Sequence, residues 1–529
     1  MTADGGECAV RTVLDERAAR YGPRTLMRID GVDVSFAQMR DRSIAAANVL
    51  RGHGVSPGDT VALFSSSTPE WVYFWLGAAR IGAMSAAVNA ANKGDYLRHA
   101  LAVSAASVVI TDTAERAQRV LEVAGELPLL RTVLTDEVPP ATDRLDVLST
   151  ADELSCASTL ESPGTRGFRP DEPAALFFTS GTTGPSKAVV TSWRYLFTAA
   201  ETVAAAWDFR AGEVIWSAMP LFHLSAVATI LAPMLVGGTT VLESAFRPTE
   251  VWDGVRGSGA VGFVGAGAMV SMLWNLPPDP SDGASGMRFI SAAPIAAEHY
   301  RAIERRYGCR VVTMYGMTEA FPIALETVDE KGVPGTSGRV NSAFEVAVRT
   351  AEGQPVVGAV GELVCRGTRP GVMSLGYLDP DTRSVRPHEE WFHTGDLARL
   401  DDDGTLTYVD RVKDAIRRRG ENVSSVEVEN VVTMYPGVSE AAAVGVPSDL
   451  GEEDILMVLA MLPGDAVDPH RLLDFCADRM PYFCVPRYVR TVPALPRNVI
   501  GRVRKDLLRA EGVGLDAWDR EAQGYVVRR

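Results

Sequence analysis

The chain has few cysteines and no excess of positive charge, and each shortage narrows the functions open to it. Its six cysteines are scattered without a CxxC pair, so the sequence indicates neither a disulfide framework nor a zinc site. Lys and Arg number 52 against 67 Asp and Glu, and the net charge of −15 argues against a nucleic acid or an anionic membrane as partner. A polyanionic substrate would therefore need a local cluster of positive charge.

Signals for secretion and membrane insertion are also lacking. The first residues show no basic region followed by an apolar core, so no signal peptide is expected. Residues 224–242 carry no charge, but Pro233, two glycines and two threonines divide them into a helix of about a dozen residues, a turn and a strand over 239–242. We expect this stretch to be buried core, and the scattered cysteines fit a cytoplasmic protein.

Strand-like and helix-like segments alternate along the first half of the chain. Strands are expected over residues 60–64 and 107–111, with a helix over 70–81 between them. Another strand, over 174–178, precedes a helix that begins at Trp193. Such alternation predicts parallel sheets flanked by helices. The 529 residues are too many for one core and suggest roughly two to four domains.

The pattern changes in the last third of the chain. Residues 338–366 alternate short strands with turns, which predicts a small antiparallel barrel or sheet, expected as a β-barrel subdomain over about 335–409. A distinct segment begins near residue 410 and has its own strands over 441–446 and 455–462. The predicted fold is α/β: a large N-terminal domain of stacked sheets over 1–409, followed by a distinct small α+β C-terminal domain over 410–529.

One polar loop follows directly behind an apolar strand. Residues 177–187 read Phe-Phe-Thr-Ser-Gly-Thr-Thr-Gly-Pro-Ser-Lys, where the glycines let backbone N–H groups approach an anion and the lysine adds charge. The spacing differs from the usual nucleotide loop, and a Ser/Thr/Gly-rich surface turn is the alternative. The predicted phosphate-binding residues are Thr179, Ser180, Gly181, Thr182, Thr183, Gly184 and Lys187.

Four further motifs follow this loop: residues 315–319 (Tyr-Gly-Met-Thr-Glu), 391–396 (Trp-Phe-His-Thr-Gly-Asp), 408–414 (Tyr-Val-Asp-Arg-Val-Lys-Asp) and 495–501 (Leu-Pro-Arg-Asn-Val-Ile-Gly). Their order and spacing resemble the acyl-adenylate-forming superfamily over nearly the whole chain. That superfamily contains acyl-CoA synthetases, adenylation domains of peptide synthetases and firefly luciferase. Residues 417–429 are similar to the branch near carnitine and crotonobetaine CoA ligases.

The resemblance implies two reactions in one site. A carboxylate attacks the α-phosphate of ATP bound with Mg²⁺ to give acyl-AMP, and after the C-terminal domain rotates, the thiol of CoA displaces AMP. The implied ligands are therefore ATP and AMP, CoA, and Mg²⁺ where adenylation occurs. The implied catalytic residues are Lys413, Arg502, Thr318 and His223. Glu319 is the expected Mg²⁺ ligand because this hard cation prefers oxygen.

The resemblance also assigns residues to the nucleotide. Thr318 would donate to the α-phosphate, Tyr315 would stack on adenine, and Asp396 would accept from the ribose hydroxyls. A helix cap at Thr318 and simple packing of Tyr315 are the alternatives. With the loop, the implied nucleotide-binding set is Ala292, Ala293, Pro294, Tyr315, Gly316, Met317, Thr318, Asp396, Tyr408 and Arg411.

The acyl and CoA sites are implied more coarsely. The expected acyl pocket is His223, Val264, Gly265, Ala266, Gly267 and Gly316, and the expected CoA-binding residues are Gly420, Glu421 and Asn422. Many small side chains favour a bulky acid, although close strand packing explains them equally well. A buried core role is the alternative for His223. Lys413 corresponds to the hinge of the C-terminal domain, with a surface salt bridge as its alternative.

One departure from the superfamily pattern bears on the chemistry. Relatives carry Gly-Lys after the 495–497 motif, and that lysine bridges the carboxylate and the phosphate during adenylation, whereas this chain has Gly501-Arg502. A guanidinium is planar and wide, so it does not replace a compact ammonium in a tight site. Losing one such preorganised donor costs on the order of 3 kcal/mol in the barrier. Lys505 lies three residues further on, and Ala188 replaces a glycine usual after Lys187.

The favoured hypothesis is an acyl-CoA ligase that joins a bulky acyl-AMP to CoA, with adenylation weak or absent because of Arg502. A separate adenylating ligase would then supply the acyl-AMP. Two alternatives remain open: a complete ATP-dependent acyl-CoA synthetase, and an acyl-AMP ligase that loads a carrier protein. A non-catalytic binder of acyl nucleotides is disfavoured, because Lys413 and Gly420 are present.

Overall fold

The computed structural model describes residues 9–139, 144–162, 169–179, 185–295, 297–350, 353–411, 415–449, 451–496 and 503–527. The chain forms two compact units, which are described separately. The first unit comprises Met1–Ala90, Leu101–Phe178 and Ala188–Asp410. The second unit comprises Ala91–Ala100, Thr179–Lys187 and Arg411–Arg529.

A nine-stranded sheet runs through the first unit in the order β22-β21-β9-β8-β4-β3-β5-β6-β7. Strands β4, β3, β5, β6 and β7 pair in parallel, β8 pairs in parallel with β4, and β21 pairs antiparallel with β9 and β22. The strands are β3 (Thr60–Leu63), β4 (Met84–Ala87), β5 (Val108–Ile110), β6 (Thr132–Thr135), β7 (Asp146–Ser149), β8 (Pro173–Thr179), β9 (Lys187–Ser192), β21 (Gly376–Leu378) and β22 (Val385–Arg386). Continuous burial of β3 and β5 is typical of a parallel sheet covered on both faces.

A seven-stranded sheet in the same unit has the order β14-β13-β12-β10-β11-β1-β2. Its strands are β1 (Thr25–Ile29), β2 (Val32–Ser35), β10 (Val214–Ser217), β11 (Thr239–Leu242), β12 (Gly262–Val264), β13 (Phe289–Ser291) and β14 (Arg310–Val312). All neighbours are parallel except the β1–β2 hairpin. Parallel strands gather their carboxyl ends along one edge, where α/β proteins place their ligands.

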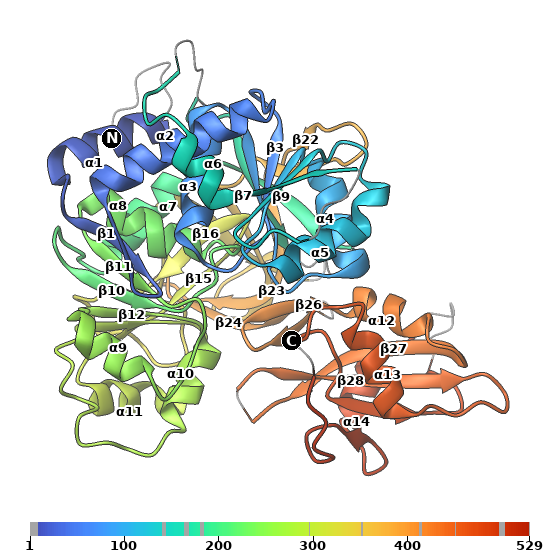
Figure 1. The fold of residues 1–529 in the computed structure, drawn as a ribbon. Coiled ribbons are helices and arrows are strands. Elements are labelled where there is room, and N and C mark those ends of the chain that lie inside the picture. Colours follow the sequence, from blue (N-terminus) through green and yellow to red (C-terminus); the bar gives the residue numbers. More distant parts are fainter. Residues whose placement is uncertain are drawn as a thin grey trace. The chain divides into compact units, whose positions relative to one another are not determined.

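Helices separate and cover the two sheets of the first unit (Figure 1). Between them lie α1 (Ala9–Tyr21), α2 (Phe36–Gly52), α3 (Pro69–Arg80), α7 (Trp193–Ala206) and α8 (Ala232–Val236). On the far side of the seven-stranded sheet lie α9 (Val251–Ser258), α10 (Gly267–Trp274) and α11 (Ala297–Tyr307). The remaining helices before the phosphate loop are α5 (Ala114–Val123), the short 3₁₀ turn η1 (Ala124–Glu126), α6 (Thr150–Cys156) and α4 (Gly94–Ser104), of which residues 94–100 belong to the second unit.

Helix α3 shows why this central layer is stable. Thr68 caps its N-terminus by accepting from the Trp71 N–H, and Pro69 occupies the first turn. Every residue from Trp71 to Arg80 is buried, and the indole of Trp75 contacts those of Trp71 and Trp193 at 5.3 Å between ring centroids. The buried guanidinium of Arg80 is neutralised by Asp15 and Glu161, each at 2.8 Å.

The charge-free stretch over residues 224–242 is buried, as expected. It forms the π-helical turn η2 (Val227–Leu231), continues into α8, ends at Gly237 with a left-handed φ of 84°, and enters β11. Within the described residues, no helix is both long enough and apolar enough to span a bilayer.

Two small antiparallel sheets complete the first unit. One has the order β15-β16-β17, with β15 (Met314–Met317), β16 (Ala320–Leu325) and β17 (Arg339–Val340). The other has the order β19-β18-β20-β23-β24, with β18 (Phe344–Arg349), β19 (Pro355–Val356), β20 (Val360–Gly367), β23 (Phe392–Leu400) and β24 (Leu406–Arg411). Both sheets contribute to one core that contains Tyr315, Ala320 and Leu363. In the region expected to form the barrel, β18, β19, β20, β23 and β24 form an open five-stranded sheet, whereas β17 joins the three-stranded sheet and β21 and β22 join the nine-stranded sheet.

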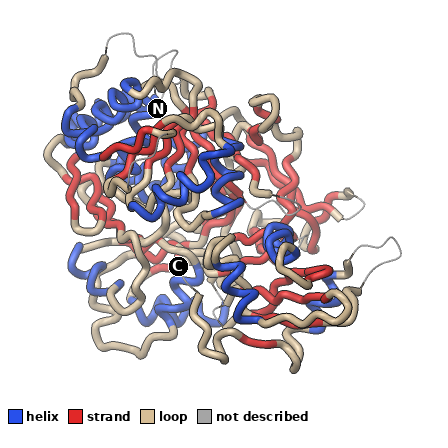
Figure 2. Tube along the Cα trace, turned by 45° about the vertical axis from the view of Figure 1, so that its right-hand side comes forward, coloured by secondary structure: helices blue, strands red, loops and turns tan. Residues whose placement is uncertain are grey.

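The second unit contains its own α+β layers. Strands β25 (Ala415–Arg418) and β26 (Glu421–Ser424) form a hairpin, and a four-stranded sheet has the order β27-β28-β29-β30. These strands are β27 (Val438–Pro447), β28 (Glu453–Met461), β29 (Tyr488–Thr491) and β30 (Trp518–Asp519). Its helices are α12 (Ser425–Thr433), α13 (Pro469–Ala477) and α14 (Lys505–Glu511), and Figure 2 distinguishes them in blue from the red strands. The predicted fold class, a large multi-sheet α/β domain followed by a smaller α+β domain, is confirmed.

Candidate functional site

Residues expected at the acyl pocket and at the nucleotide meet at the carboxyl ends of β12 and β13. The Gly265 N–H donates to Ser291 O at 3.0 Å, and the Gly267 N–H donates to Ala293 O at 3.1 Å. Val264, Ala266 and Ala292 are buried at this edge. Two loops that are far apart in the sequence are therefore joined by backbone bonds where α/β sheets place their ligands.

The glycines at this edge are required by packing. A Cβ on Gly267 would overlap the Pro294 carbonyl oxygen, and a Cβ on Gly262 would overlap the Phe289 ring. At Gly265 a Cβ would lie 2.6 Å from the Phe263 ring, and at Gly316 it would lie 2.7 Å from Ala320 O. Close packing explains these four glycines, so they do not indicate a wide acyl pocket.

Tyr315, Asp396 and Tyr408 come together although they lie on three different strands. The Tyr315 hydroxyl donates to Asp396 Oδ2 at 2.7 Å, and the rings of Tyr315 and Tyr408 lie 5.9 Å apart. Asp396 is 3% exposed, whereas Tyr408 is 37% exposed. Burial and the neighbouring Asp396 charge raise the pKa of Tyr315, so its hydroxyl remains a donor. A carboxylate oriented by a phenol beside an accessible ring suits a ribose and its base.

Thr318 and Glu319 lie at the turn between β15 and β16, and three donors from other segments hold them. The buried Tyr195 hydroxyl, on α7, donates to Thr318 O at 3.1 Å. The Ser374 N–H donates to Glu319 O at 2.8 Å, and the Tyr377 hydroxyl donates to Glu319 Oε1 at 2.7 Å. Glu319 is 6% exposed. A carboxylate beside a threonine hydroxyl supplies oxygen atoms, which is the donor type that Mg²⁺ prefers.

Further side chains support this turn from behind. Ser374 Oγ lies 2.7 Å from His388 Nε2, and the His388 ring packs edge-on against the rings of Tyr377 and Phe392. Burial lowers the pKa of His388 to about 4, so the imidazole is neutral at physiological pH. Burial and the Glu319 charge raise the pKa of Tyr377.

The sequence interpretation missed Tyr195, Ser374, Tyr377 and His388. Tyr377 lies 58 residues after Glu319, and Tyr195 lies 123 residues before Thr318. No local spacing connects such positions, because they meet only when β21 and α7 pack beside the turn. A tyrosine directly after Gly376 on a short strand was the available signal, and alone it indicates only a buried edge.

His223 lies in the loop that follows β10, next to the π-helical turn η2. The backbone N–H of His223 donates to Pro220 O at 3.3 Å, and the imidazole ring lies 4.6 Å from the Phe222 ring between centroids. Ser225 Oγ donates to Pro220 O at 2.6 Å and closes the loop. Ser217 Oγ, just before the loop, donates to Val264 O at 2.8 Å. The loop is thereby attached to the strand that leads into residues 264–267.

Several predicted residues belong to the second unit. Gly420 and Arg419 are the two central residues of the β25–β26 hairpin, with φ values of 83° and 50°, and Arg418 pairs with Glu421 across the turn. Two positive φ values define a type I′ turn, which strongly favours glycine. The Gly420 N–H donates to Glu452 Oε2 at 2.8 Å. Turn geometry therefore gives a reason for Gly420 that is independent of CoA; Asn422 follows on β26 and Arg411 ends β24.

The described ends of the phosphate loop also fall in the second unit. Thr179 ends β8 and the exposed Lys187 begins β9. The Ser186 N–H donates to Glu427 Oε1 at 2.6 Å within this unit. Burial raises the pKa of Glu427 to about 7. Ser180, Gly181, Thr182, Thr183 and Gly184 lie outside the described residues, as do Lys413 and Arg502.

Lys505, the nearest lysine after Arg502 in the sequence, is already engaged. It begins α14, and its Nζ lies 2.6 Å from Glu429 Oε1 and 2.8 Å from Ser425 Oγ on α12. The Lys505 side chain is 15% exposed. Moving the Lys505 ammonium towards the position of Arg502 would break its half-buried ion pair with Glu429.

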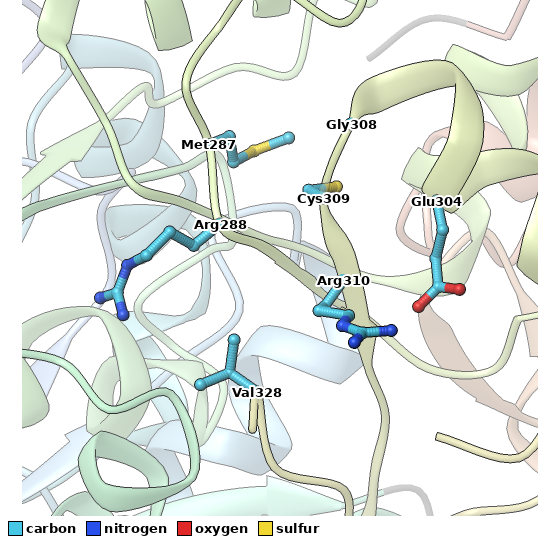
Figure 3. Close-up of a pocket in the computed structure, with 7 residues that line it drawn as sticks. All are labelled: Met287, Arg288, Glu304, Gly308, Cys309, Arg310 and Val328. Atoms are coloured by element: carbon cyan, nitrogen blue, oxygen red, sulfur yellow. The ribbon is translucent and has the colours of Figure 1, made fainter. Parts of the chain in front are cut away.

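A surface depression of about 460 Å³ lies at the opposite end of the seven-stranded sheet (Figure 3). Met287, Arg288, Cys309 and Arg310 of its lining precede or begin β13 and β14, and Figure 3 shows Arg288 and Arg310 pointing away from each other. Arg288 Nη2 is held by Glu213 at 2.7 Å. This depression is separate from the carboxyl-end loops that bring together the predicted residues.

Comparison with known proteins agrees with this arrangement. Residues 14–378 match the model of the AMP-binding enzyme family, and residues 427–502 match the AMP-binding enzyme C-terminal domain. A crotonobetaine/carnitine–CoA ligase from Salmonella paratyphi A is 29% identical over 527 residues, which cover 96% of this chain and all of the relative.

Two solved structures extend the comparison to the fold. The amide bond synthetase McbA from Marinactinospora thermotolerans has a TM-score of 0.82 at 26% identity, covering 95% of this chain and 99% of that one. ATP-bound MatB from Rhodopseudomonas palustris has a TM-score of 0.68 at 25% identity, covering 96% of this chain and 99% of that one. The family model covers more than half of the chain, and this chain therefore belongs to the AMP-binding enzyme family.

Proposed function

We propose that this chain is an acyl-CoA ligase that works mainly on a preformed acyl-AMP. The CoA sulfur attacks the acyl carbonyl carbon, the bond from that carbon to the AMP oxygen breaks, and AMP leaves with the electron pair. The thiol proton passes to solvent. Support comes from family membership and from the whole-length similarity to a CoA ligase.

In this proposal the first unit holds the AMP half of the intermediate. Tyr408 and Tyr315 face the base, Asp396 accepts from the ribose hydroxyls, and Thr318 donates to the α-phosphate. The Tyr315–Asp396 hydrogen bond fixes the carboxylate before ligand arrives. Glu319 binds Mg²⁺ whenever ATP is used, and His223 borders the acyl group. Because these donors and acceptors are already in place, binding of acyl-AMP requires little rearrangement of the site.

The second unit supplies the CoA half in this proposal. It corresponds to a small rotating domain over 410–529, with Lys413 as its hinge and Gly420, Glu421 and Asn422 beside the thiol arm. Arg411 lies near the ribose, and residues 179–187 hold phosphate.

The observation that carries the split between half-reactions is Arg502. A guanidinium stands where the family pattern has the adenylating lysine, and its width and planarity do not fit a site built for an ammonium. Lys505 does not readily replace the adenylating lysine, because its ammonium is paired with Glu429. We therefore propose that a separate ligase supplies the acyl-AMP.

We propose a bulky acid because of three alanines, and not because of the small-residue composition as a whole. The four glycines at the sheet edge are explained by packing, so the argument rests on Ala266, Ala292 and Ala293. Alanine methyl groups leave room that larger side chains would fill.

A second acceptor class is favoured by one comparison. The McbA structure is that of an amide bond synthetase, and its similarity covers both units. Attack of an amine nitrogen on the same acyl-AMP releases the same AMP and loses one proton. An amine is therefore tested beside CoA and a holo-carrier protein.

The test begins with purified protein and a panel of bulky acids. We expect little thioester from acid, ATP and CoA, but ready conversion of the corresponding synthetic acyl-AMP with CoA, both followed by product mass. Amide or acylated carrier as the sole product would replace CoA as the acceptor. Robust ATP–pyrophosphate exchange by the unaltered protein with its own acid would refute the split.

Arg502→Lys sharpens this test. We expect it to raise the ATP–pyrophosphate exchange rate by roughly a hundredfold to a thousandfold, because it restores a compact donor to the developing charge. Arg504→Lys is the matched control, since the Arg504 side chain is 42% exposed and pairs with Asp506 at 2.5 Å. Equal responses from both variants would show that Arg502 has no special role.

A further inference from the structure

The turn that carries Thr318 and Glu319 depends on a tyrosine that no motif includes. Tyr377 donates through its hydroxyl to Glu319 Oε1 at 2.7 Å, within the usual range for a hydroxyl bound to a carboxylate. The backbone of the same glutamate is held independently, because the Ser374 N–H donates to Glu319 O at 2.8 Å. Main chain and side chain of Glu319 are thus fixed by residues only three positions apart.

Tyr377 is itself rigidly placed. It pairs with Val189 on β9 and with Arg386 on β22, so strand β21 is held on both sides. Gly376 has a φ of 128°, and a Cβ at that position would overlap Arg386 O, so the strands approach more closely than another residue would allow. The His388 ring packs against the Tyr377 ring at 5.5 Å between centroids. The phenol therefore has little freedom to follow a moving carboxylate.

We propose that Tyr377 is a positioning residue that presets the Glu319 carboxylate for Mg²⁺ bound with ATP; this inference rests on the proposed function. Fixing a glutamate side chain costs rotamer entropy, and a partner that already holds the side chain removes this cost from metal binding. Mg²⁺ demands near-octahedral oxygen geometry and tolerates little misorientation. A phenol is a neutral donor, so it orients the carboxylate while leaving its negative charge to attract the cation, which an arginine or lysine would cancel.

The chain contains a matched control for this role. Tyr300 on α11 donates to Glu326 Oε2 at 2.6 Å and to Val311 O at 3.0 Å, and it is fully buried. Tyr300→Phe removes the same kind of bond between a phenol and a glutamate in the same unit. It touches none of the residues assigned to nucleotide, acid or CoA.

The experiment measures nucleotide affinity by titration calorimetry on the full chain. ATP is titrated in Mg²⁺ and in EDTA, and AMP in EDTA, for the unaltered protein, Tyr377→Phe and Tyr300→Phe. We expect Tyr377→Phe to reduce the gain in ATP affinity that Mg²⁺ provides by about 10-fold to 100-fold, as is usual when the partner of a metal ligand is lost. AMP affinity stays unchanged, and Tyr300→Phe changes neither affinity.

The outcomes separate this inference from the proposed function. If the unaltered protein binds neither AMP nor ATP, the proposed function fails and the inference falls with it. If it binds both but Mg²⁺ gives no gain, or Tyr377→Phe keeps the full gain, the inference alone is overturned. An equal loss in Tyr300→Phe would also overturn it, because the effect would then reflect stability. Thermal unfolding of both variants confirms that each is folded during titration.

Discussion

Two buried carboxylates of the first unit and one buried carboxylate of the second unit are held in different ways. In the first unit, phenols donate to Asp396 and Glu319, each at 2.7 Å. In the second unit, guanidinium groups contact Asp454: Arg418 at 3.0 Å and Arg487 at 2.9 Å. A phenol orients a carboxylate without neutralising it, whereas an arginine makes a closed ion pair. The first arrangement suits a site for cations and sugar hydroxyls, and the second suits a structural support.

The largest effect is expected from breaking the ion pairs of the second unit. Asp454→Asn leaves the guanidinium of Arg418, 1% exposed, without its charge partner. We expect a loss of about 3–5 kcal/mol in the free energy of unfolding, measured by urea denaturation. Asp33→Asn breaks an exposed pair with Arg28 and should cost at most about 1 kcal/mol. Similar losses in the two variants would remove the contrast between the units.

Low pH should instead weaken the first unit. Burial lowers the pKa of His388 to about 4, so its contribution to stability is complete above the unfolded pKa near 6.5 and is lost as pH falls towards 4. The full loss is about 3 kcal/mol. Stability curves measured between pH 7 and pH 4 should be flatter for His388→Gln than for the unaltered protein. A slope for His388→Gln equal to that of the unaltered protein would contradict this prediction.

The smallest effect concerns the hairpin turn of the second unit. Gly420→Ala should cost about 1 kcal/mol, because alanine resists a positive φ, whereas Gly420→Asn should cost less. In the proposed function Gly420 lies beside the thiol arm, so we expect both variants to raise the KM for CoA. The KM for acyl-AMP should stay unchanged. An unchanged CoA KM in the folded Asn variant would leave turn geometry as the whole reason for Gly420.

Much of the architecture follows from local sequence patterns. The helix expected over 70–81 corresponds to α3, and the glycine pair expected to break the 224–242 stretch lies at the end of α8. The candidate site residues inside motifs were named because the order and spacing of the motifs resemble those of the superfamily. Tyr315 was expected at the adenine and Asp396 at the ribose, and a hydrogen bond joins the two side chains.

The supporting residues could not be found in the same way. Tyr195 and Tyr377 reach the Thr318-Glu319 turn through packing of elements that the sequence separates widely. The glycines at residues 262–267 show the converse problem. Composition allowed either a wide pocket or close packing, and the choice depends on where the Phe289 and Phe263 rings and the Pro294 carbonyl lie.

The ion pair between Lys505 and Glu429 limits which mutations could bring a lysine to the position of Arg502. Lys505 lies only three residues from Arg502, close enough in sequence for a small backbone shift to bring it towards the Arg502 position. It is instead a fixed support between α14 and α12, and recruiting it would weaken the domain that must carry it. Under the proposed division of the half-reactions, stronger ATP-driven activity would have to come from a change at residue 502 itself.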